Sequence, residues 1–350
     1  MSDKIRIAVL GASGYTGSEL VRLLVRHPRA EIVALTADSK AGRTMAEVFP
    51  QFMHLDLPRL VKIGDVDPES VDVVFCALPH ATTQVVLRDL IARRPALKVV
   101  DLSADFRLAD PAAYERWYGH AHAALELQAE AVYGIPELYR DRIAAARLVA
   151  NPGCFTTTAI LPVVPLLAAN LIESDGIVID AKTGMSGAGR SAKEGMLFSE
   201  VSEGIHAYGV GAHRHMAELD QEYSLAAGVP VVPTFTPHLT PMIRGIYATI
   251  YVRCTAGATP EALHEALSVR YAAEPFITVL PFGAVPQSRH VKGSNQVQIG
   301  VVADRQPGRA IVVSTLDNLV KGASGQAVQN MNVVCGLPET TGLDQIALFP

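Results

Sequence analysis

The sequence predicts an α/β protein of two domains: a doubly wound, Rossmann-like parallel sheet, followed by an α+β domain with a mixed or antiparallel sheet. Strand-like apolar runs alternate with helix-like segments in the first part of the chain, whereas in the second part several strands follow one another. A length of 350 residues also exceeds what one hydrophobic core usually serves. We expect the domains at 1–150 and 151–320, with a C-terminal helix in 321–350 that returns to the first domain.

Composition narrows the class of protein. Hydrophobic residues make up 49% and charged residues 19%, which is typical of a globular chain. A net charge of −5 argues against a nucleic-acid or anionic-membrane partner. The start of the chain lacks a signal-peptide pattern, and no apolar run reaches the length of a membrane span. These features predict a cytoplasmic protein with no membrane and no nucleic-acid partner.

The first domain begins with a strand, a glycine turn and a helix. The expected strands of this domain are 5–10, 31–36, 72–78, 98–102 and 147–150, with helices at 18–27 and 79–94. The turn has the spacing GxxGxxG rather than GxGxxG, and its candidate dinucleotide-binding residues are Gly11, Ser13, Gly14, Tyr15, Thr16 and Gly17. Such a turn can also be purely structural, but strand–turn–helix is the context that pyrophosphate binding requires.

The loop after the second strand bears on the choice of nucleotide. NAD-binding domains usually end this strand with an acidic residue that binds the ribose diol. Here Ser39, Lys40 and Arg43 favour a 2′-phosphate and therefore NADP. Asp38 is evidence against that choice, and an ordinary charged loop is the alternative interpretation.

Cys154 follows Asn151-Pro152-Gly153 at a predicted helix start. The positive end of a helix dipole favours the thiolate, which is the nucleophilic form of cysteine. A small buried residue is the commoner role of an unpaired cysteine. Because proline is not expected inside a helix, Pro162 and Pro165 predict a helix of only about two turns, followed by a kink.

The other cysteines, Cys76, Cys254 and Cys335, lie in or beside apolar runs and predict packing. No CxxC pair or HExxH motif is present, so we expect no metal. In a helix predicted from about residue 213 to 227, His215 and Glu218 share a face while His213 points elsewhere. A carboxylate beside a histidine is typical of general acid/base catalysis, although a lone histidine is more often packed or solvated.

Two further segments are candidates for ligand contacts. The glycine loop after the strand 176–181 carries Ser186, Gly187, Gly189 and Arg190, and suits a cofactor or an anionic substrate, or else an ordinary mobile loop. Arg107 follows the strand 98–102 and is suited to binding a carboxylate or phosphate, with a salt bridge to Asp105 as the alternative.

The remaining expected strands are 231–236, 243–252, 277–280, 296–302 and 310–314, with helices at 260–273 and 321–334.

Taken in order, these segments resemble the N-acetyl-gamma-glutamyl-phosphate reductases. The motifs that carry the resemblance are 11–17 (GASGYTG), 103–107 (SADFR), 151–154 (NPGC), 213–215 (HRH), 237–241 (PHLTP) and 321–327 (KGASGQA). They span nearly the whole chain, and the set is specific although each motif alone is weak. The chain is also similar, more distantly, to aspartate-semialdehyde dehydrogenases. Members often have proline at the position of Ala217, which affects the start of the helix and not the reacting side chains.

The resemblance implies NADPH-dependent reduction of N-acetyl-L-glutamyl 5-phosphate to the 5-semialdehyde, a step of arginine biosynthesis. It implies Cys154 as the nucleophile that forms a thioester, His215 as the acid/base and Glu218 as its support. Asn151, Arg107 and Arg190 are candidates for substrate binding, and a homo-oligomer is expected. The alternatives are the same chemistry on aspartyl or aminoadipyl phosphate, a cofactor-free Cys/His acyl hydrolase and a non-catalytic NADP-binding sensor.

Overall fold

The computed structural model describes residues 4–349, which divide into two compact units. The first unit contains the described residues up to Pro152 together with Ala323–Asp344. The second contains Gly153–Gly322 and the end of the described chain from Gln345. Each unit is built around its own seven-stranded sheet.

The first sheet is parallel throughout, in the order β3-β2-β1-β4-β5-β7-β6. The chain runs outward from β1 to β3 and then crosses back to β4, which is the doubly wound arrangement. Its strands are β1 (Ile5–Leu10), β2 (Ala30–Thr36), β3 (Leu60–Val61), β4 (Val73–Cys76), β5 (Lys98–Asp101), β6 (Val132–Tyr133) and β7 (Leu148–Ala150). Its helices are α1 (Tyr15–Leu24), α2 (Met45–Val48), α3 (Thr83–Arg93), α4 (Pro111–Tyr118), α5 (Leu125–Glu130), α6 (Pro136–Ala144) and α11 (Gly325–Val334).

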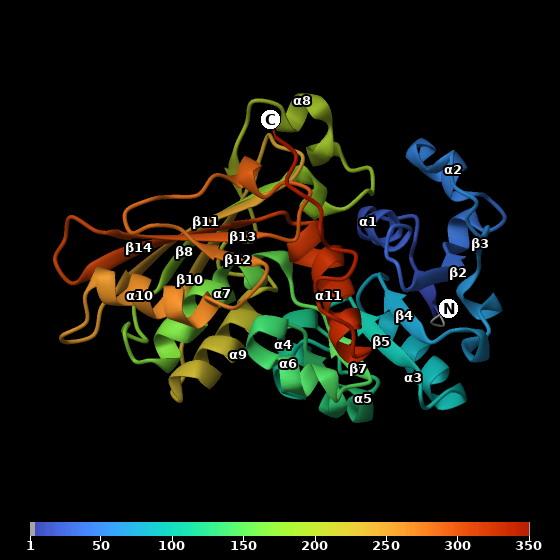
Figure 1. Ribbon diagram of the computed structural model, residues 1–350, viewed down its shortest axis with the longest axis horizontal. Helices are drawn as coiled ribbons and strands as arrows, with labels where there is room; N and C mark the ends of the chain where they lie inside the picture. The colour runs from blue at the N-terminus through green and yellow to red at the C-terminus, as the bar shows by residue number, and fades with distance from the viewer. Residues whose placement is uncertain (1–3, 350) are drawn as a thin grey trace. The chain divides into compact units, whose positions relative to one another are not determined.

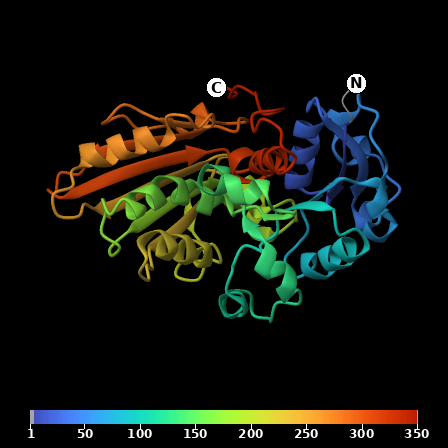
Figure 2. The same ribbon diagram turned by 60° about the horizontal axis from the view of Figure 1, so that its bottom comes forward.

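Helices cover both faces of this parallel sheet. On one face, Leu90 of α3 and Leu127 of α5 form a buried cluster with Val74 of β4. On the other, Ile143 of α6 and the end of α11 pack against Val149 of β7. Figure 2 shows α11, in red, beside α1, in blue, and the two helices are in contact. Burial on both faces explains why the strands are continuous apolar runs rather than alternating ones.

The second sheet is mixed, in the order β12-β13-β14-β11-β8-β10-β9. The β12–β13 and β8–β10 pairs are parallel, and the other pairs are antiparallel. Its strands are β8 (Val178–Gly184), β9 (His206–Ala207), β10 (Thr234–Thr240), β11 (Ile246–Arg253), β12 (Ile277–Val279), β13 (Val297–Ala303) and β14 (Arg309–Leu316). Its helices are α7 (Cys154–Ala168), α8 (Phe198–Val201), α9 (Met216–Ala227) and α10 (Pro260–Tyr271).

Alternating burial along β11 separates the two faces of the mixed sheet. Ile246, Ile250 and Val252 are buried, whereas Tyr251 and Arg253 are exposed. Helices α7 and α10 contact the sheet on one side, and α9 packs on α7 (Figure 1). A doubly wound parallel sheet and a mixed α+β sheet are the fold class that the sequence predicts, and this prediction is confirmed.

The predicted strand bounds 231–236 and 243–252 are wrong around the segment 237–241, because most of that segment lies within strand β10. β10 pairs with β8 along its whole length, including Pro237. Phe235, Pro237 and Leu239 are buried in alternation, which is the period of a half-buried strand. The segment contains two prolines, and proline usually argues against a strand. The alternating pattern therefore does not predict a strand from the sequence alone.

The predicted short helix at Cys154 is also wrong, because α7 continues for 15 residues with Pro162 and Pro165 inside it. Proline 165 supplies no N–H for the carbonyl of Leu161, four residues earlier. The hydroxyl of Tyr271, on α10, donates to that carbonyl instead. A tertiary contact thus replaces the hydrogen bond that the proline removes, so α7 stays continuous.

Candidate active site

Cys154 is the first residue of α7, directly after the turn that follows β7. Gly153 occupies the N-cap position in an extended conformation, and no side chain caps the helix there. The hydroxyls of Thr156 and Thr158 donate to the carbonyls of Gly153 (2.7 Å) and Cys154 (2.8 Å) and stabilise the first turn. The half-buried thiol therefore lies at the positive end of a full-length helix, an environment that favours a thiolate.

His215 lies at the N-cap of α9, so this helix begins three residues later than expected. Its imidazole lies against Gly153. A Cβ atom on Gly153 would sit only 2.4 Å from Nε2 of His215. The absence of a side chain at that glycine is what allows the ring to approach the backbone next to Cys154.

Glu218 is fully buried, and its carboxylate contacts the start of α7. Oε2 accepts hydrogen bonds from the backbone N–H of Gly153 (3.0 Å) and from the hydroxyl of Thr156 (3.1 Å). Cys154, His215 and Glu218 are therefore brought together in the second unit. A carboxylate that binds the turn before the cysteine is a contact that the sequence does not reveal.

His213 does not point away from this cluster, contrary to the expectation from the sequence. Its ring centroid lies 4.7 Å from that of His215, and its Nδ1 accepts the backbone N–H of His215 at 3.1 Å. Burial lowers the pKa of His213 to about 4, so the ring is neutral at pH 7. The His213 ring also makes edge-on contacts with the rings of Tyr208, Phe155 and Phe235, so His215 has a group of packed aromatic rings beside it.

Tyr208 and Gly322 are further neighbours of Cys154 that the sequence analysis missed. Burial, and secondarily the charge of Cys154, raises the pKa of the Tyr208 phenol. A Cβ atom on Gly322 would lie 2.8 Å from Cβ of Cys154. Gly322 belongs to a π-helical turn at Val320–Ser324, and such turns often occur at functional sites. The KGASGQA motif was the available signal for Gly322, but its contact with Cys154 is tertiary.

The glycine loop after β8 forms a short 3-10 turn, Met185–Ala188. The Ser186 hydroxyl accepts a hydrogen bond from Asn318 Nδ2 at 2.9 Å, and Asn318 Oδ1 accepts the N–H of Gly245 at 2.8 Å. The sequence does not predict a role for Asn318. Its side chain links this loop to Gly245, which lies in the same unit. Gly187 lies in the turn, and Gly189 and the exposed Arg190 follow at its end.

The predicted nucleotide turn lies at the carboxyl end of β1 in the first unit. Gly11 has a φ of +83°, and a Cβ atom there would be 2.4 Å from the carbonyl oxygen of Ala77. A Cβ atom on Gly17 would be equally close to the carbonyl oxygen of Gly11. Gly14 is the N-cap of α1, where no side chain caps the first-turn N–H groups. A tight backbone turn opening on an uncapped helix fits a nucleotide diphosphate.

The exposed side chain of Asp38 accepts a hydrogen bond from the protein backbone. Its Oδ1 accepts the N–H of Ile63 at 3.0 Å. The neighbouring Ser39 and Arg43 are exposed, and Lys40 is half-buried. The acidic residue that counted against NADP is therefore engaged with the turn that follows β3.

Arg107 and Asn151 form part of the buried interior of the first unit. Arg107 donates to the carbonyls of Asn151 (2.8 Å) and Leu102 (3.0 Å). The side chain of Asn151 donates to the carbonyl of Ala323 and accepts from Asn330. These contacts shape the segment that leads to Cys154. Nearby, burial raises the pKa of Asp101 to about 7.

No group of three or more His, Cys, Asp or Glu side chains within residues 4–349 is placed to hold a metal ion. No helix of this described range is long and apolar enough to span a membrane.

Family models match the chain in two consecutive stretches. The model described as semialdehyde dehydrogenase, NAD binding domain, matches residues 6–146, which lie in the first unit. The model described as semialdehyde dehydrogenase, dimerisation domain, matches residues 154–318, which lie in the second. The second match begins at Cys154.

Solved structures share this architecture. Aspartate semialdehyde dehydrogenase II from Vibrio cholerae, complexed with ASA, has a TM-score of 0.73 at 16% identity, covering 96% of this chain and 99% of that one. Aspartate semialdehyde dehydrogenase with NADP from Candida albicans has a TM-score of 0.69 at 17% identity, covering 95% and 99%. Likeness at this identity shows the fold alone.

Curated relatives are far more similar in sequence. Proteins named N-acetyl-gamma-glutamyl-phosphate reductase from Afipia carboxidovorans and Rhodospirillum rubrum are 69% and 62% identical, over at least 99% of each chain. A probable chloroplastic one from Arabidopsis thaliana is 56% identical over 99% of this chain and 86% of its own. Identity of this extent over the full length, together with both domain matches, shows that the chain belongs to the N-acetyl-gamma-glutamyl-phosphate reductase family and carries the two semialdehyde dehydrogenase domains.

Proposed function

We propose that the protein reduces N-acetyl-L-glutamyl 5-phosphate to N-acetyl-L-glutamate 5-semialdehyde and phosphate, with NADPH as reductant, in arginine biosynthesis. Family membership supports the activity. The observation that carries the mechanism is the cluster at the start of α7, where His215 lies against Gly153 and Glu218 binds the same turn beside Cys154.

In this proposal Cys154 is the nucleophile. Its thiolate attacks the acyl carbon, the bond to the phosphate oxygen breaks, and phosphate leaves with the electron pair, so a thioester forms on Sγ. NADPH, when bound, supplies the hydride that reduces the thioester. Nε2 of His215 then protonates the oxyanion on the resulting thiohemiacetal and takes the proton back as the carbon–sulfur bond breaks. The start of α7 favours the thiolate as attacking and leaving group.

Glu218 acts in this proposal by positioning the pair, since its carboxylate joins α9 to the turn before Cys154. Arg190, exposed at the end of the glycine loop, is the stronger candidate for the substrate's phosphate or carboxylate. Arg107 and Asn151 are engaged within the first unit, where Arg107 donates to the carbonyl of Asn151 and Asn151 to that of Ala323, and they remain weaker candidates for substrate binding.

We assign the cofactor as NADP rather than NAD. Asp38 accepts a backbone hydrogen bond from Ile63, which leaves Ser39, Lys40 and Arg43 as the groups suited to a 2′-phosphate. Gly11, Ser13, Gly14, Tyr15, Thr16 and Gly17 would hold the diphosphate at the start of α1. Ser186, Gly187 and Gly189, in the glycine loop after β8, are further candidates for cofactor contacts.

The decisive experiment is phosphate-dependent reduction of NADP⁺ by N-acetylglutamate semialdehyde, with the semialdehydes of aspartate and aminoadipate in parallel. Turnover that prefers N-acetylglutamate semialdehyde is expected. A preference for another semialdehyde reassigns the substrate. Binding of NADP⁺ without turnover of any of them supports a sensor, and neither binding nor turnover supports a cofactor-free hydrolase.

Two variants test the residue roles. Cys154→Ser should abolish turnover while NADP⁺ still binds, and full activity would refute the nucleophile assignment. His215→Asn should lower the rate by about 10²–10⁴-fold, the usual contribution of a general acid/base. An unaltered pH–rate profile in that variant would assign the proton transfer to another residue.

We further propose a homo-oligomer formed through the sheet face opposite α7 and α10. Tyr251 and Val178 are paired across β11 and β8, and both are exposed (40% and 36%). The match to a dimerisation domain supports a second copy as the occupant. Val178→Asp with Tyr251→Asp should shift sedimentation toward the monomer. Val269→Asp, at an exposed position of α10, is the control and should not.

We place the enzyme in the cytoplasm, since the proposed nucleophile must remain a reduced thiol. Detection of the protein in a cell fraction other than the cytosol would contradict that placement.

A further inference from the structure

A cavity lies within the first unit, at the edge of the parallel sheet where the strands begin. It has a volume of about 340 Å³ and opens where β1, β4 and β5 begin. Its charged and thiol-bearing lining residues are Lys4, Arg29, Asp72, Arg94, Lys98 and Cys335. Four cationic side chains and one carboxylate leave a formal excess of three positive charges, in a chain whose net charge is −5.

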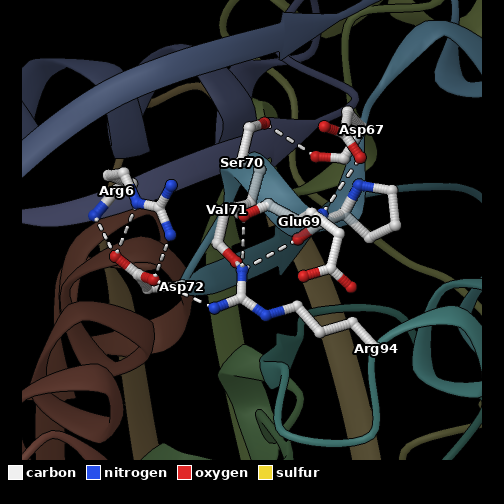
Figure 3. Close-up of polar contacts among 8 residues, drawn as sticks. Arg6, Asp67, Glu69, Ser70, Val71, Asp72 and Arg94 are labelled. Atoms are coloured by element: carbon white, nitrogen blue, oxygen red, sulfur yellow. Dashed lines mark hydrogen bonds and ion pairs between the residues drawn. The ribbon is translucent and has the colours of Figure 1, made fainter.

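The one carboxylate is already shared between two guanidinium groups. Asp72 accepts from Arg6 Nε (3.1 Å) and Arg6 Nη2 (2.8 Å), and from Arg94 Nη2 (3.2 Å), as Figure 3 shows. Hydrogen bonding from Arg6, above all, lowers the pKa of Asp72 to about 2. Asp72 therefore remains ionised and engaged, and it does not neutralise the other cations of the cavity.

Neutral acceptors hold two of the cations in place without removing their charge. Arg94 Nη1 donates to the backbone carbonyls of Pro68 (2.9 Å), Glu69 (3.2 Å) and Val71, as drawn in Figure 3. Lys98 Nζ donates to the carbonyl of Val334, at the end of α11, at 2.7 Å. These contacts with loop and helix-end carbonyls fix the positions of the two side chains. They leave the positive excess of the cavity unchanged, since a carbonyl carries only a dipole.

We propose that this cavity binds a small phosphate-bearing anion, with the phosphate group among Lys4, Arg29 and Lys98. Guanidinium and ammonium groups are the side chains that proteins use to bind phosphate. The volume lies at the lower end of the range for small-molecule sites. Five of the ten lining residues are charged, and four of those five are cationic, which favours an anionic ligand. Inorganic phosphate and a phosphomonoester share this chemistry, and the experiment below distinguishes them.

The cavity is separate from the predicted nucleotide turn. It lies at the amino end of β1, and Gly11 follows the carboxyl end of that strand. Six residues of β-strand span about 20 Å. An anion in the cavity and a dinucleotide at the turn therefore occupy opposite edges of the sheet, and the proposal stands independently of the reductase activity.

Cys335 provides a site-specific readout, because its half-buried thiol lines the cavity. Burial raises its pKa, the charges of Lys98 and Arg29 oppose that rise, and Asp72 adds to it. A bound phosphate adds negative charge beside the thiol and so lowers the thiolate fraction. Alkylation slows roughly tenfold for each unit by which the thiol pKa rises.

The test is alkylation of the full-length protein with iodoacetamide at constant ionic strength, set with chloride. Inorganic phosphate or glycerol 3-phosphate is titrated in, and modification of Cys335 is measured by peptide mass spectrometry. We expect saturable slowing at Cys335. Equal protection by both anions identifies inorganic phosphate as sufficient, and protection at lower glycerol 3-phosphate concentrations identifies a phosphomonoester. Slowing that is confined to the Cys154 peptide, or that never saturates, overturns the proposal.

Paired variants complete the test. Lys4→Gln with Arg29→Gln should abolish the protection of Cys335, and persistence of protection would refute the site. Arg93→Gln is the control, because this residue of α3 is outside the cavity lining and pairs with Asp89 at 3.6 Å. It should keep full protection. Lys4→Gln alone, at an exposed position, should weaken protection severalfold, and it replaces the double variant if circular dichroism shows that variant to be unfolded.

Discussion

The carboxylate of Glu218 lies 3.0 Å from the backbone nitrogen of Gly153, and this contact joins the start of α9 to the residue before Cys154. The two residues are 65 positions apart in the sequence. The same carboxylate also accepts the hydroxyl of Thr156. His215 is the N-cap of α9. The buried side chain of Glu218 therefore links the turn before Cys154 to the start of the helix that bears the His215 imidazole.

Replacing Glu218 by Ala should therefore cost about 1.5–3 kcal/mol in the free energy of unfolding, because it removes a hydrogen bond to a charged acceptor. We also expect turnover to fall at least tenfold, roughly 1.4 kcal/mol of transition-state stabilisation. Glu218→Gln keeps a carbonyl acceptor and should retain most activity. Urea unfolding and steady-state kinetics check both. If Gln proves as harmful as Ala, the charge of Glu218 and not its hydrogen bond is what the site needs.

Gly322→Ala should impair catalysis because the new Cβ atom would lie 2.8 Å from Cβ of Cys154. The collision displaces the thiol, and a misplacement of about 1 Å can cost on the order of 10²-fold in rate. Gly195→Ala is the matched control, since no atom lies within 4 Å of the Cβ position there. The measurements are kcat and the alkylation rate of Cys154. Equal behaviour of the two variants would show that Gly322 has no positioning role.

Tyr271→Phe should destabilise the second unit by about 1–3 kcal/mol, because the carbonyl of Leu161 would lose its donor while buried in α7. Pro165 cannot supply a replacement N–H. Urea denaturation measures the change, with Val269→Ala, at an exposed position of the same helix, as the control. Equal effects of the two substitutions would mean that the Tyr271 hydroxyl does not compensate for the proline.

His213 should make the protein less stable at acidic pH. Its pKa is about 4 in the folded state, against an ordinary value of 6.5 for a histidine in water. Between those two values the unfolded chain binds more protons, so the free energy of unfolding falls as the pH drops from about 6.5 to about 4. The full difference corresponds to on the order of 3 kcal/mol.

His213→Asn should flatten that dependence, and its Oδ1 can still accept the backbone N–H of His215. Urea unfolding at several pH values across this window measures the slope. The same slope in the variant and the parent protein would assign the acid sensitivity to other groups.

Lys40→Gln with Arg43→Gln should raise the KM for NADPH roughly 10–100-fold, as expected for the loss of charge-assisted contacts worth about 1.5–3 kcal/mol. The KM for NADH should stay within about twofold, since that cofactor has no 2′-phosphate. Arg26→Gln, an exposed cation outside the loop, is the control. A parallel rise in both KM values would contradict the proposed role of this loop.

Much of the fold and of the candidate site follows from the sequence alone. Apolar runs separated by helix-like segments predict the parallel sheet, because strands buried on both faces need no polar residues. The strand at Ile5–Leu10 was predicted at its observed bounds. Cys154 at a helix start is likewise a local feature, since a Pro-Gly turn and the residues after it decide it. The glycine spacing at 11–17 belongs to the same class of local signal.

The tertiary structure alone decided the rest, for a physical reason that recurs. Pro162 and Pro165 predict an early end of the helix because the hydrogen bond that a proline removes is a local loss, and only the position of Tyr271 shows the replacement at Pro165. Glu218 binding Gly153, and Gly322 making room beside Cys154, are contacts between residues far apart in the chain. A sequence pattern reflects interactions between residues that are neighbours within one helix or strand. Contacts between different elements depend on how those elements pack, and no local pattern in the sequence records that packing.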